Sequence, residues 1–111
     1  MEYEKAFSER LAKLRINAGM SARDLSLSMG QSSGYINKIE RAQNMPSMTG
    51  FFYMCQILKI TPKDFFDDAV QDPYRVNAIT EKLKLMSDKQ LSAIEAVIEA
   101  IMEKSRTAFI L

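Results

Sequence analysis

The feature that most constrains the fold is a sharp turn at Gly30 between two short helix-forming segments. Ser21 can cap the first segment, which we expect to cover residues 22–29. Gly30 can adopt the left-handed backbone conformation that lets a chain turn within a few residues. We expect Ser32 to cap the second segment, which continues to about residue 41. The sequence therefore predicts two short helices that meet at a fixed angle.

Apolar residues recur at helical spacing through the rest of the chain, and no stretch alternates as a β-strand would. The other expected helices are residues 4–18, one capped by Ser47 that reaches Leu58, one from Pro62 to Phe66, one over residues 73–86, and one that follows Ser87. Their expected inward-facing residues include Phe65, Phe66, Val76, Ile79, Leu83 and Met86. The sequence predicts an all-α fold with a five-helix domain in residues 1–70 and two further helices in residues 71–111. The tight pair at its centre is typical of a helix-turn-helix unit.

The composition argues against several classes of function. The chain has no histidine, which removes the usual general base and the common zinc ligand sets. Cys55 is its single cysteine, so no intrachain disulfide can form, and we expect a buried thiol in a reducing compartment. The acidic start is unlike a signal peptide, and no apolar stretch is long enough to cross a bilayer. We expect a cytoplasmic protein that is no enzyme and needs no metal or cofactor.

Residues spread through the first five expected helices resemble the pattern of a known family. In chain order they are Leu11, Leu14, Arg15, Gly19, Met20, Ser21, Leu25, Gly30, Ser32, Ile36, Ile39, Glu40, Arg41, Pro46, Ser47, Phe51, Met54, Cys55, Leu58, Ile60, Thr61, Phe65 and Phe66. Their order and spacing are similar to those of the five-helix domain of phage repressor and Cro-like proteins, the xenobiotic-response-element type of helix-turn-helix. The resemblance covers about residues 7–67. It implies a transcriptional regulator, with repression as the expected mode, that binds operator DNA as a homodimer.

The resemblance also implies which residues contact double-stranded DNA. In this family the third helix lies in the major groove with its N-terminal side chains against base edges. Ser33, Gly34 and Lys38 then occupy base-contacting positions, while Ser32 and Tyr35 occupy positions that usually touch phosphate. The other residues with an implied DNA contact are Ser21, Ala22, Arg23, Asn37, Arg41, Gln43 and Asn44.

Two further residues correspond to a structural pair of the family. Arg15 and Glu40 match positions that form a salt bridge between the first helix and the end of the third. The resemblance therefore implies a role in stability, because removal of one partner from a partly buried pair costs on the order of 3 kcal/mol.

The sequence departs from the family pattern at the expected DNA contacts. Ala22 stands where the family usually has glutamine, and Ala42 stands where glycine usually follows the arginine. Gln43 and Asn44 occupy positions that are often basic. Gly34 offers no side chain at a central contact position and lowers helix stability. These departures keep a function without DNA open.

The C-terminal segment, residues 73–111, carries more apolar surface than one short neighbouring helix covers. Its last helix contains the adjacent apolar pairs 97–98 and 101–102, and residues 108–111 are apolar too. This segment can fold back onto the five-helix domain of its own chain or meet a second copy. We expect it to form a homodimer, since two DNA half-sites need two linked domains. The alternative is an antitoxin or another protein-interaction module whose C-terminal helices neutralise a partner protein.

Overall fold

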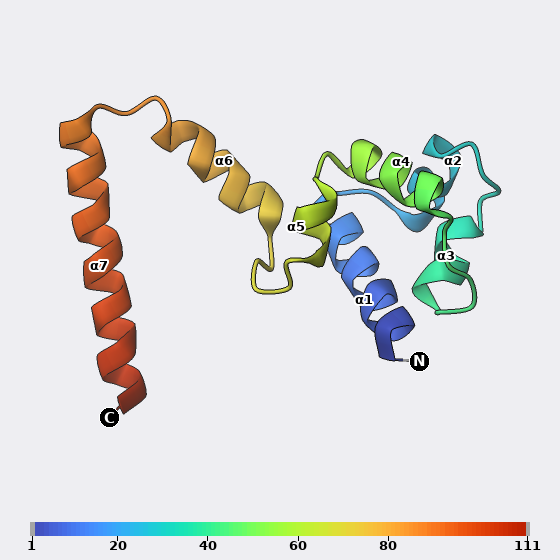
Figure 1. Cartoon of the computed structure of the whole chain (residues 1–111), viewed down its shortest axis with the longest axis horizontal. Helices are drawn as coiled ribbons and strands as arrows, with labels where there is room; N and C mark the ends of the chain where they lie inside the picture. Colours follow the sequence, from blue (N-terminus) through green and yellow to red (C-terminus); the bar gives the residue numbers. More distant parts are fainter. Residues whose placement is uncertain (1, 111) are drawn as a thin grey trace. The chain divides into compact units, whose positions relative to one another are not determined.

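The computed structural model describes residues 2–110, leaving the side chains of residues 105–110 outside the description. Within this range the chain forms helices and no strand, as the sequence predicts (Figure 1). The helices are α1 (Glu2–Asn17), α2 (Ala22–Ser28), α3 (Tyr35–Glu40), α4 (Met48–Leu58), α5 (Pro62–Phe66), α6 (Pro73–Leu83) and α7 (Asp88–Ile110). The all-α prediction is therefore confirmed.

The core of the first five helices is a closely packed cluster of aliphatic and aromatic side chains. Its buried members are Leu11, Leu14, Leu25, Met29, Ile36, Ile39, Phe51, Met54, Cys55, Leu58, Ile60 and Phe65. Phe7 packs on this cluster with its ring centroid 4.8 Å from that of Phe65 and 5.8 Å from that of Phe51. The prediction that Phe66 helps close the core is wrong, because its side chain is 63% exposed. Helix α5 is a single short helix, so only one of two adjacent side chains can face inward.

Helices α1 to α4 all end in the same backbone arrangement. After each helix, one residue has a positive φ near 60–70°, and two backbone N–H groups return to carbonyls of the last turn. Glycine provides this conformation at Gly19 and Gly30, as the sequence predicts for the turn after α2. Ala42 and Lys59 adopt it after α3 and α4, both with φ 58°. Two of the four helix ends therefore carry a side chain where glycine fits without strain.

A buried arginine fixes α1 to the end of α5. Arg10 is only 6% exposed. Its Nε donates a hydrogen bond to the Phe65 carbonyl at 2.7 Å. Its Nη2 donates to the carbonyls of Asp64 at 2.8 Å and Asp67 at 3.0 Å. These carbonyls lie in the last turn of α5 and just after it, where a helix lacks its own donors. The sequence pattern did not predict this long-range cap.

The chain divides into two units, Met1–Val76 and Asn77–Leu111. Residues 71–76 pack with the first unit, since Pro73 is fully buried and Tyr74 packs against the core. The amide nitrogen of Asn17 also donates to the Gln71 carbonyl at 3.0 Å. The sequence places its boundary at residue 70, and the separate function of the C-terminal segment stays a prediction.

The second unit contains the end of α6 and all of α7. Ser87 and Gln90 form a complete capping box at the start of α7: Gln90 N donates to Ser87 Oγ at 3.3 Å, and Ser87 N donates to Gln90 Oε1 at 3.0 Å. Helix α6 ends at Leu83, earlier than the predicted residue 86. The prediction that the apolar residues of α6 lie inside is wrong for Val76 and Ile79, which are 47% and 51% exposed.

Candidate nucleic-acid interface

The turn between α2 and α3 sets the angle between these two helices. Gly30, with φ 71°, ends α2, and the Gln31 N–H donates to the Ser26 carbonyl at 3.0 Å. The chain then passes through an exposed bend before the first residue of α3. A Cβ added to Gly30 would meet nothing within 4 Å, so its glycine is required by backbone conformation alone.

Ser26 supplies the cap that the sequence assigned to Ser32. Its fully buried hydroxyl accepts a hydrogen bond from the Ile36 N–H at 3.0 Å and donates to the Ala22 carbonyl at 2.7 Å. Helix α3 begins at Tyr35, with Gly34 as an N-cap that makes no side-chain hydrogen bond. The prediction that Ser32 caps this helix is wrong, because a hydroxyl from α2 already satisfies a free donor at its start.

The late start of α3 changes which of the expected base-contacting residues lie on the helix. Ser33 and Gly34 lie in the turn that leads into α3 rather than in its first helical turn, and the Tyr35 N–H donates to the Ser32 carbonyl at 3.0 Å. Glycine and serine are weak helix formers, which explains the late start. Lys38 therefore lies on α3 itself, whereas Ser33 lies on the loop before it.

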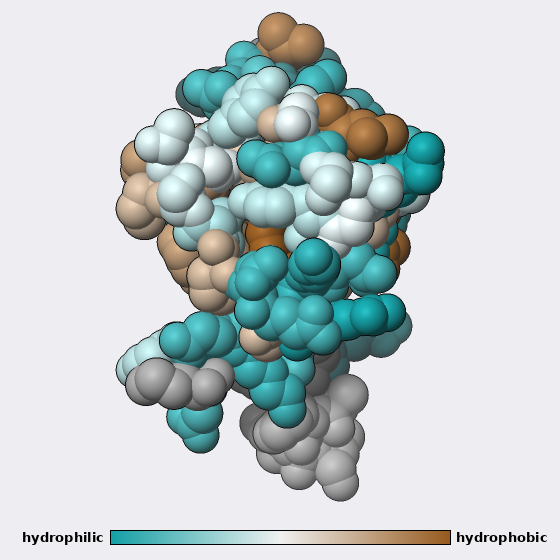
Figure 2. Space-filling model, turned by 90° about the vertical axis from the view of Figure 1, so that its right-hand side faces the viewer, coloured by the Kyte–Doolittle hydropathy of each residue, from teal (hydrophilic) through white to brown (hydrophobic). Residues whose placement is uncertain are grey.

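Most of the candidate DNA-contacting residues are exposed on one part of the first unit. Exposed residues among them are Ser21, Arg23, Ser32, Ser33, Asn37, Lys38, Arg41, Gln43 and Asn44. Ala22, Gly34 and Tyr35 are half-buried. Figure 2 faces the side on which α2 and α3 lie in Figure 1, and that surface is mostly hydrophilic or near neutral, with small separate apolar areas. This face has the polar character that contact with nucleic acid requires.

Charge is distributed unevenly along the first unit. Residues 15–44 contain four basic side chains and two acidic ones, so that this segment carries a formal charge of +2 although the whole chain carries only +1. The acidic side chains nearest in sequence after α5 are Asp67, Asp68 and Asp72, which lie outside the candidate interface. The local positive charge favours phosphate contacts despite the nearly neutral chain.

The end of α3 is fixed to α1 by an ion pair. Arg15 Nε lies 2.7 Å from Glu40 Oε2, and Arg15 Nη2 lies 3.0 Å from Glu40 Oε1, which is a two-point contact. The hydrogen bonds that Arg15 donates to the Glu40 carboxylate raise the pKa of Arg15, and its Nη1 also donates to the Met20 carbonyl at 2.8 Å. The side chains of Arg15 and Glu40 are only 15% and 11% exposed, so they position α3 and are not available to a ligand.

Two other contacts complete this arrangement. Ser8 Oγ donates to the Ile39 carbonyl at 2.6 Å and is buried, which fixes the last turn of α3 against α1. The Tyr35 hydroxyl lies close to the start of α4, 3.7 Å from the place a Cβ on Gly50 would occupy. Sequence reasoning assigned no role to Ser8 or Ser26, although each is a polar residue on the buried side of its helix.

The described residues include no group of three potential metal ligands, and none of the described helices is long and apolar enough to span a membrane. Burial raises the pKa of the Cys55 thiol to about 11, which keeps it protonated and unreactive at neutral pH. The exposed residues of the helix-turn-helix remain the candidate functional surface.

Comparison with known proteins agrees with this geometry. A family model described as helix-turn-helix matches residues 11–65, which contain α2 to α4, all but the last residue of α5, and the C-terminal part of α1. No curated protein and no solved structure gave a match. The matched family consists of DNA-binding transcription regulators. Residues 11–65 thus form a helix-turn-helix domain of the phage repressor and Cro-like family, and the protein is a DNA-binding transcription regulator.

Proposed function

We propose that the protein is a cytoplasmic repressor that binds a pseudo-palindromic operator as a homodimer and catalyses no reaction. The observation that carries this proposal is the exposed face of α3, held at its start by Ser26 and at its end by Glu40. A rigid, polar helix of this kind can enter the major groove without reorganisation.

Lys38 and Ser33 are the proposed base contacts. Lys38 lies exposed on α3 and can donate to guanine acceptors, and Ser33 can donate or accept from the loop before the helix. Asn37, next to Lys38, can pair with adenine where it reaches a base edge. Gly34 contributes no side chain, so its part in binding is a close approach of the backbone.

The remaining candidates are proposed to contact the DNA backbone. Ser32 and Tyr35 flank the start of α3, and Arg41, Gln43 and Asn44 follow its end. The start of α2, at Ser21, Ala22 and Arg23, completes the set. Only Arg23 and Arg41 are charged among these eight, so the affinity should depend less steeply on salt than that of a strongly basic protein.

Helix α7 is the proposed dimer contact. Leu91, Ile94, Ile98 and Ile101 follow one another at spacings of three, four and three residues, which is the repeat of a helical pair. Ile98 and Ile101 are 46% and 60% exposed, and the adjacent Val97 and Met102 are 55% and 58% exposed. A second copy would cover this stripe and join two DNA-binding domains. The side chains of residues 108–111 lie outside the described part, so the predicted contribution of this end stays a prediction.

A binding selection on random duplex DNA, followed by footprinting on the enriched sequence, tests the proposal. Lys38→Ala should lower affinity by about tenfold and relax the preference at one base pair of each half-site. Lys63→Ala is the matched control, since it removes the same charge from the exposed surface of α5 outside the proposed contacts. Equal losses from both variants, or selection of no sequence with two half-sites, would refute the assignment.

The exposed stripe of α7 also fits the second candidate function, an antitoxin that neutralises a partner protein. The two differ in what covers the stripe: a second copy in one, another protein in the other. Light scattering of the purified chain distinguishes them. A dimer that Ile98→Glu converts to a monomer supports the repressor, whereas a monomer that binds a co-expressed neighbour through the same residue supports the antitoxin.

A further inference from the structure

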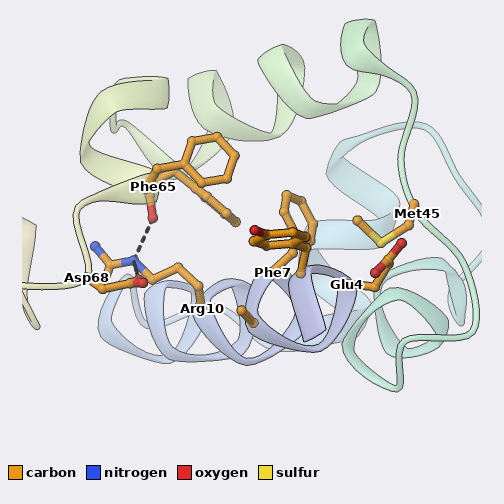
Figure 3. A pocket seen from close by; sticks show the side chains of 9 residues that line it. Glu4, Phe7, Arg10, Met45, Phe65 and Asp68 are labelled. Carbon is orange, nitrogen blue, oxygen red and sulfur yellow. Dashed lines mark hydrogen bonds and ion pairs between the residues drawn. The ribbon is translucent and has the colours of Figure 1, made fainter. Parts of the chain in front are cut away.

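The first unit contains a partly open cavity beside the N-terminal part of α1. Its volume is about 370 Å³, and its walls include Phe7, Phe65, Phe66 and Met45 (Figure 3). These residues come from α1, from the end of α5 and from the loop before α4. A cavity of this volume with apolar walls is of the size that holds a small organic molecule.

Large apolar side chains are exposed around this one cavity. Phe66 is 63% exposed, Met45 is 46% exposed and Tyr3 is 84% exposed, and all three line it. Single exposed apolar side chains are ordinary on a protein surface, whereas a group of them around a hollow is typical of a binding site. A ligand in the cavity would cover apolar surface that the first unit leaves in contact with water.

The charged groups that line the cavity have partners within the protein. Arg10 donates to three carbonyls at the end of α5, and its Nε lies 3.8 Å from Asp68 Oδ1. Glu4 also has an interaction within the chain. In Figure 3 Arg10 and Asp68 lie at one end of the cavity and Met45 lies at the other, with Phe7 between them. A charged ligand would therefore lose hydration on entering without meeting a charge that lacks a partner.

The aromatic walls are arranged as a cluster that one more ring can extend. The Phe65 ring centroid lies 4.8 Å from that of Phe7 and 5.1 Å from that of Phe66, the second pair at an interplanar angle of 72°. Aromatic rings attract one another in such tilted and edge-to-face arrangements beyond the gain from buried area. A methionine sulfur at the edge of a ring adds to this attraction.

We propose that this cavity binds a neutral aromatic molecule of one or two rings, held against Phe7 and Phe66 with its edge beside Met45. The walls select a ring over a saturated compound of the same outline, and the partnered charges select a neutral ligand over an ion. Binding of this ligand does not depend on the proposed function, so the following experiment uses no DNA.

The probe is 2-naphthol, which is neutral at neutral pH, titrated into the full chain labelled with ¹³C at the methionine methyl groups. The ring current of the bound probe should shift the Met45 methyl resonance in a saturable manner, while that of Met102 on α7 should not shift. The charged analogues 2-naphthoate and 2-naphthylmethylammonium should bind at least about fivefold more weakly. Decahydro-2-naphthol, which has the same outline but no aromatic ring, should bind about two- to tenfold more weakly.

Variants test whether the aromatic wall binds the probe. Phe66→Ala should weaken binding of 2-naphthol about tenfold, because it removes one wall of the cavity. Phe52→Ala is the matched control, since Phe52 is 48% exposed on α4 outside the cavity, and it should leave the affinity unchanged. The proposal is overturned by equal or tighter binding of either ion or of the saturated compound, by equal effects of the two variants, or by no saturable shift at Met45.

Discussion

Ala42 is a residue at which the structure predicts that removal of a side chain stabilises the protein. It follows the last residues of α3 with φ 58°, and its N–H donates to the Ile39 carbonyl at 2.9 Å. The next N–H, that of Gln43, donates to the Lys38 carbonyl at 2.9 Å, so the helix end is fully formed around a left-handed alanine. This left-handed conformation costs a residue with a Cβ about 1–2 kcal/mol.

The size of the expected gain follows from two opposing effects. Ala42→Gly removes the left-handed penalty but gives the unfolded chain more freedom, which costs about 0.4–1 kcal/mol. Ala42 is exposed, so no buried contact is lost. We expect a net rise of about 0.5–1 kcal/mol in the free energy of unfolding. For a domain of this size the midpoint of thermal unfolding should rise by about 2–8 °C.

Thermal and urea unfolding followed by circular dichroism measure this change. Ala12→Gly is the control: Ala12 lies inside α1 with ordinary helical geometry, and the same substitution there should cost about 1 kcal/mol. Lys59→Gly, at the second left-handed residue, should stabilise as Ala42→Gly does, and Gly30→Ala should destabilise. If Ala42→Gly lowers stability as much as Ala12→Gly, the account of this helix end is wrong.

Three further predictions concern buried polar groups. Arg10→Met should lower the free energy of unfolding by about 2–4 kcal/mol, measured by urea denaturation, because three carbonyls lose their donor; a loss below about 1 kcal/mol would contradict the capping role. Arg15→Ala should lower the free energy of unfolding by about 3 kcal/mol. The double variant Arg15→Met with Glu40→Leu should lower it by less, because no buried charge is left without a partner. If the loss in the double variant equals the sum of the losses in the two single variants, the pair is not coupled. Burial raises the pKa of Cys55 from 9.0 to about 11 and that of Tyr74 from 10.0 to about 12. The free energy of unfolding should therefore be unaffected by these groups below pH 9 and should fall as the pH rises through 11. Cys55→Ala should reduce this fall in denaturation curves measured between about pH 8 and 11, and an unchanged dependence on pH would contradict the assignment.

Local interactions were the part of the fold that the sequence predicted well. The predicted caps at Ser21 and Ser47, and likewise Thr61 before α5, each accept a hydrogen bond from the N–H three residues further on, so the sequence alone contains both partners. The same holds for Ser87 and Gln90 at the start of α7. Where the partner lies close in the chain, a short pattern determines the contact.

Three features that the sequence did not predict depend on partners outside the local pattern. Arg10 meets carbonyls 54 to 57 residues away, and Ser8 meets one 31 residues away. Ser32 satisfied the local rule for a helix cap, yet Ser26, ten residues before Ile36, supplies the hydrogen bond instead. A polar residue on the apolar side of a helix was the available signal, and a single sequence does not show which buried group it will meet.

These distant contacts explain how α3 can keep its place while its exposed side chains vary. Its start is held by Ser26 and its end by Ser8 and Glu40, and all three act through buried or half-buried atoms. Lys38 and Ser33 take no part in them, because their side chains are exposed. Substitution of Lys38 or Ser33 should therefore change stability by no more than about 0.5 kcal/mol, although it changes DNA preference. The residues proposed to contact bases thus differ from those that hold α3 in place, which lie on α1, on α2 and at the end of α3, so one set can change without loss of the other.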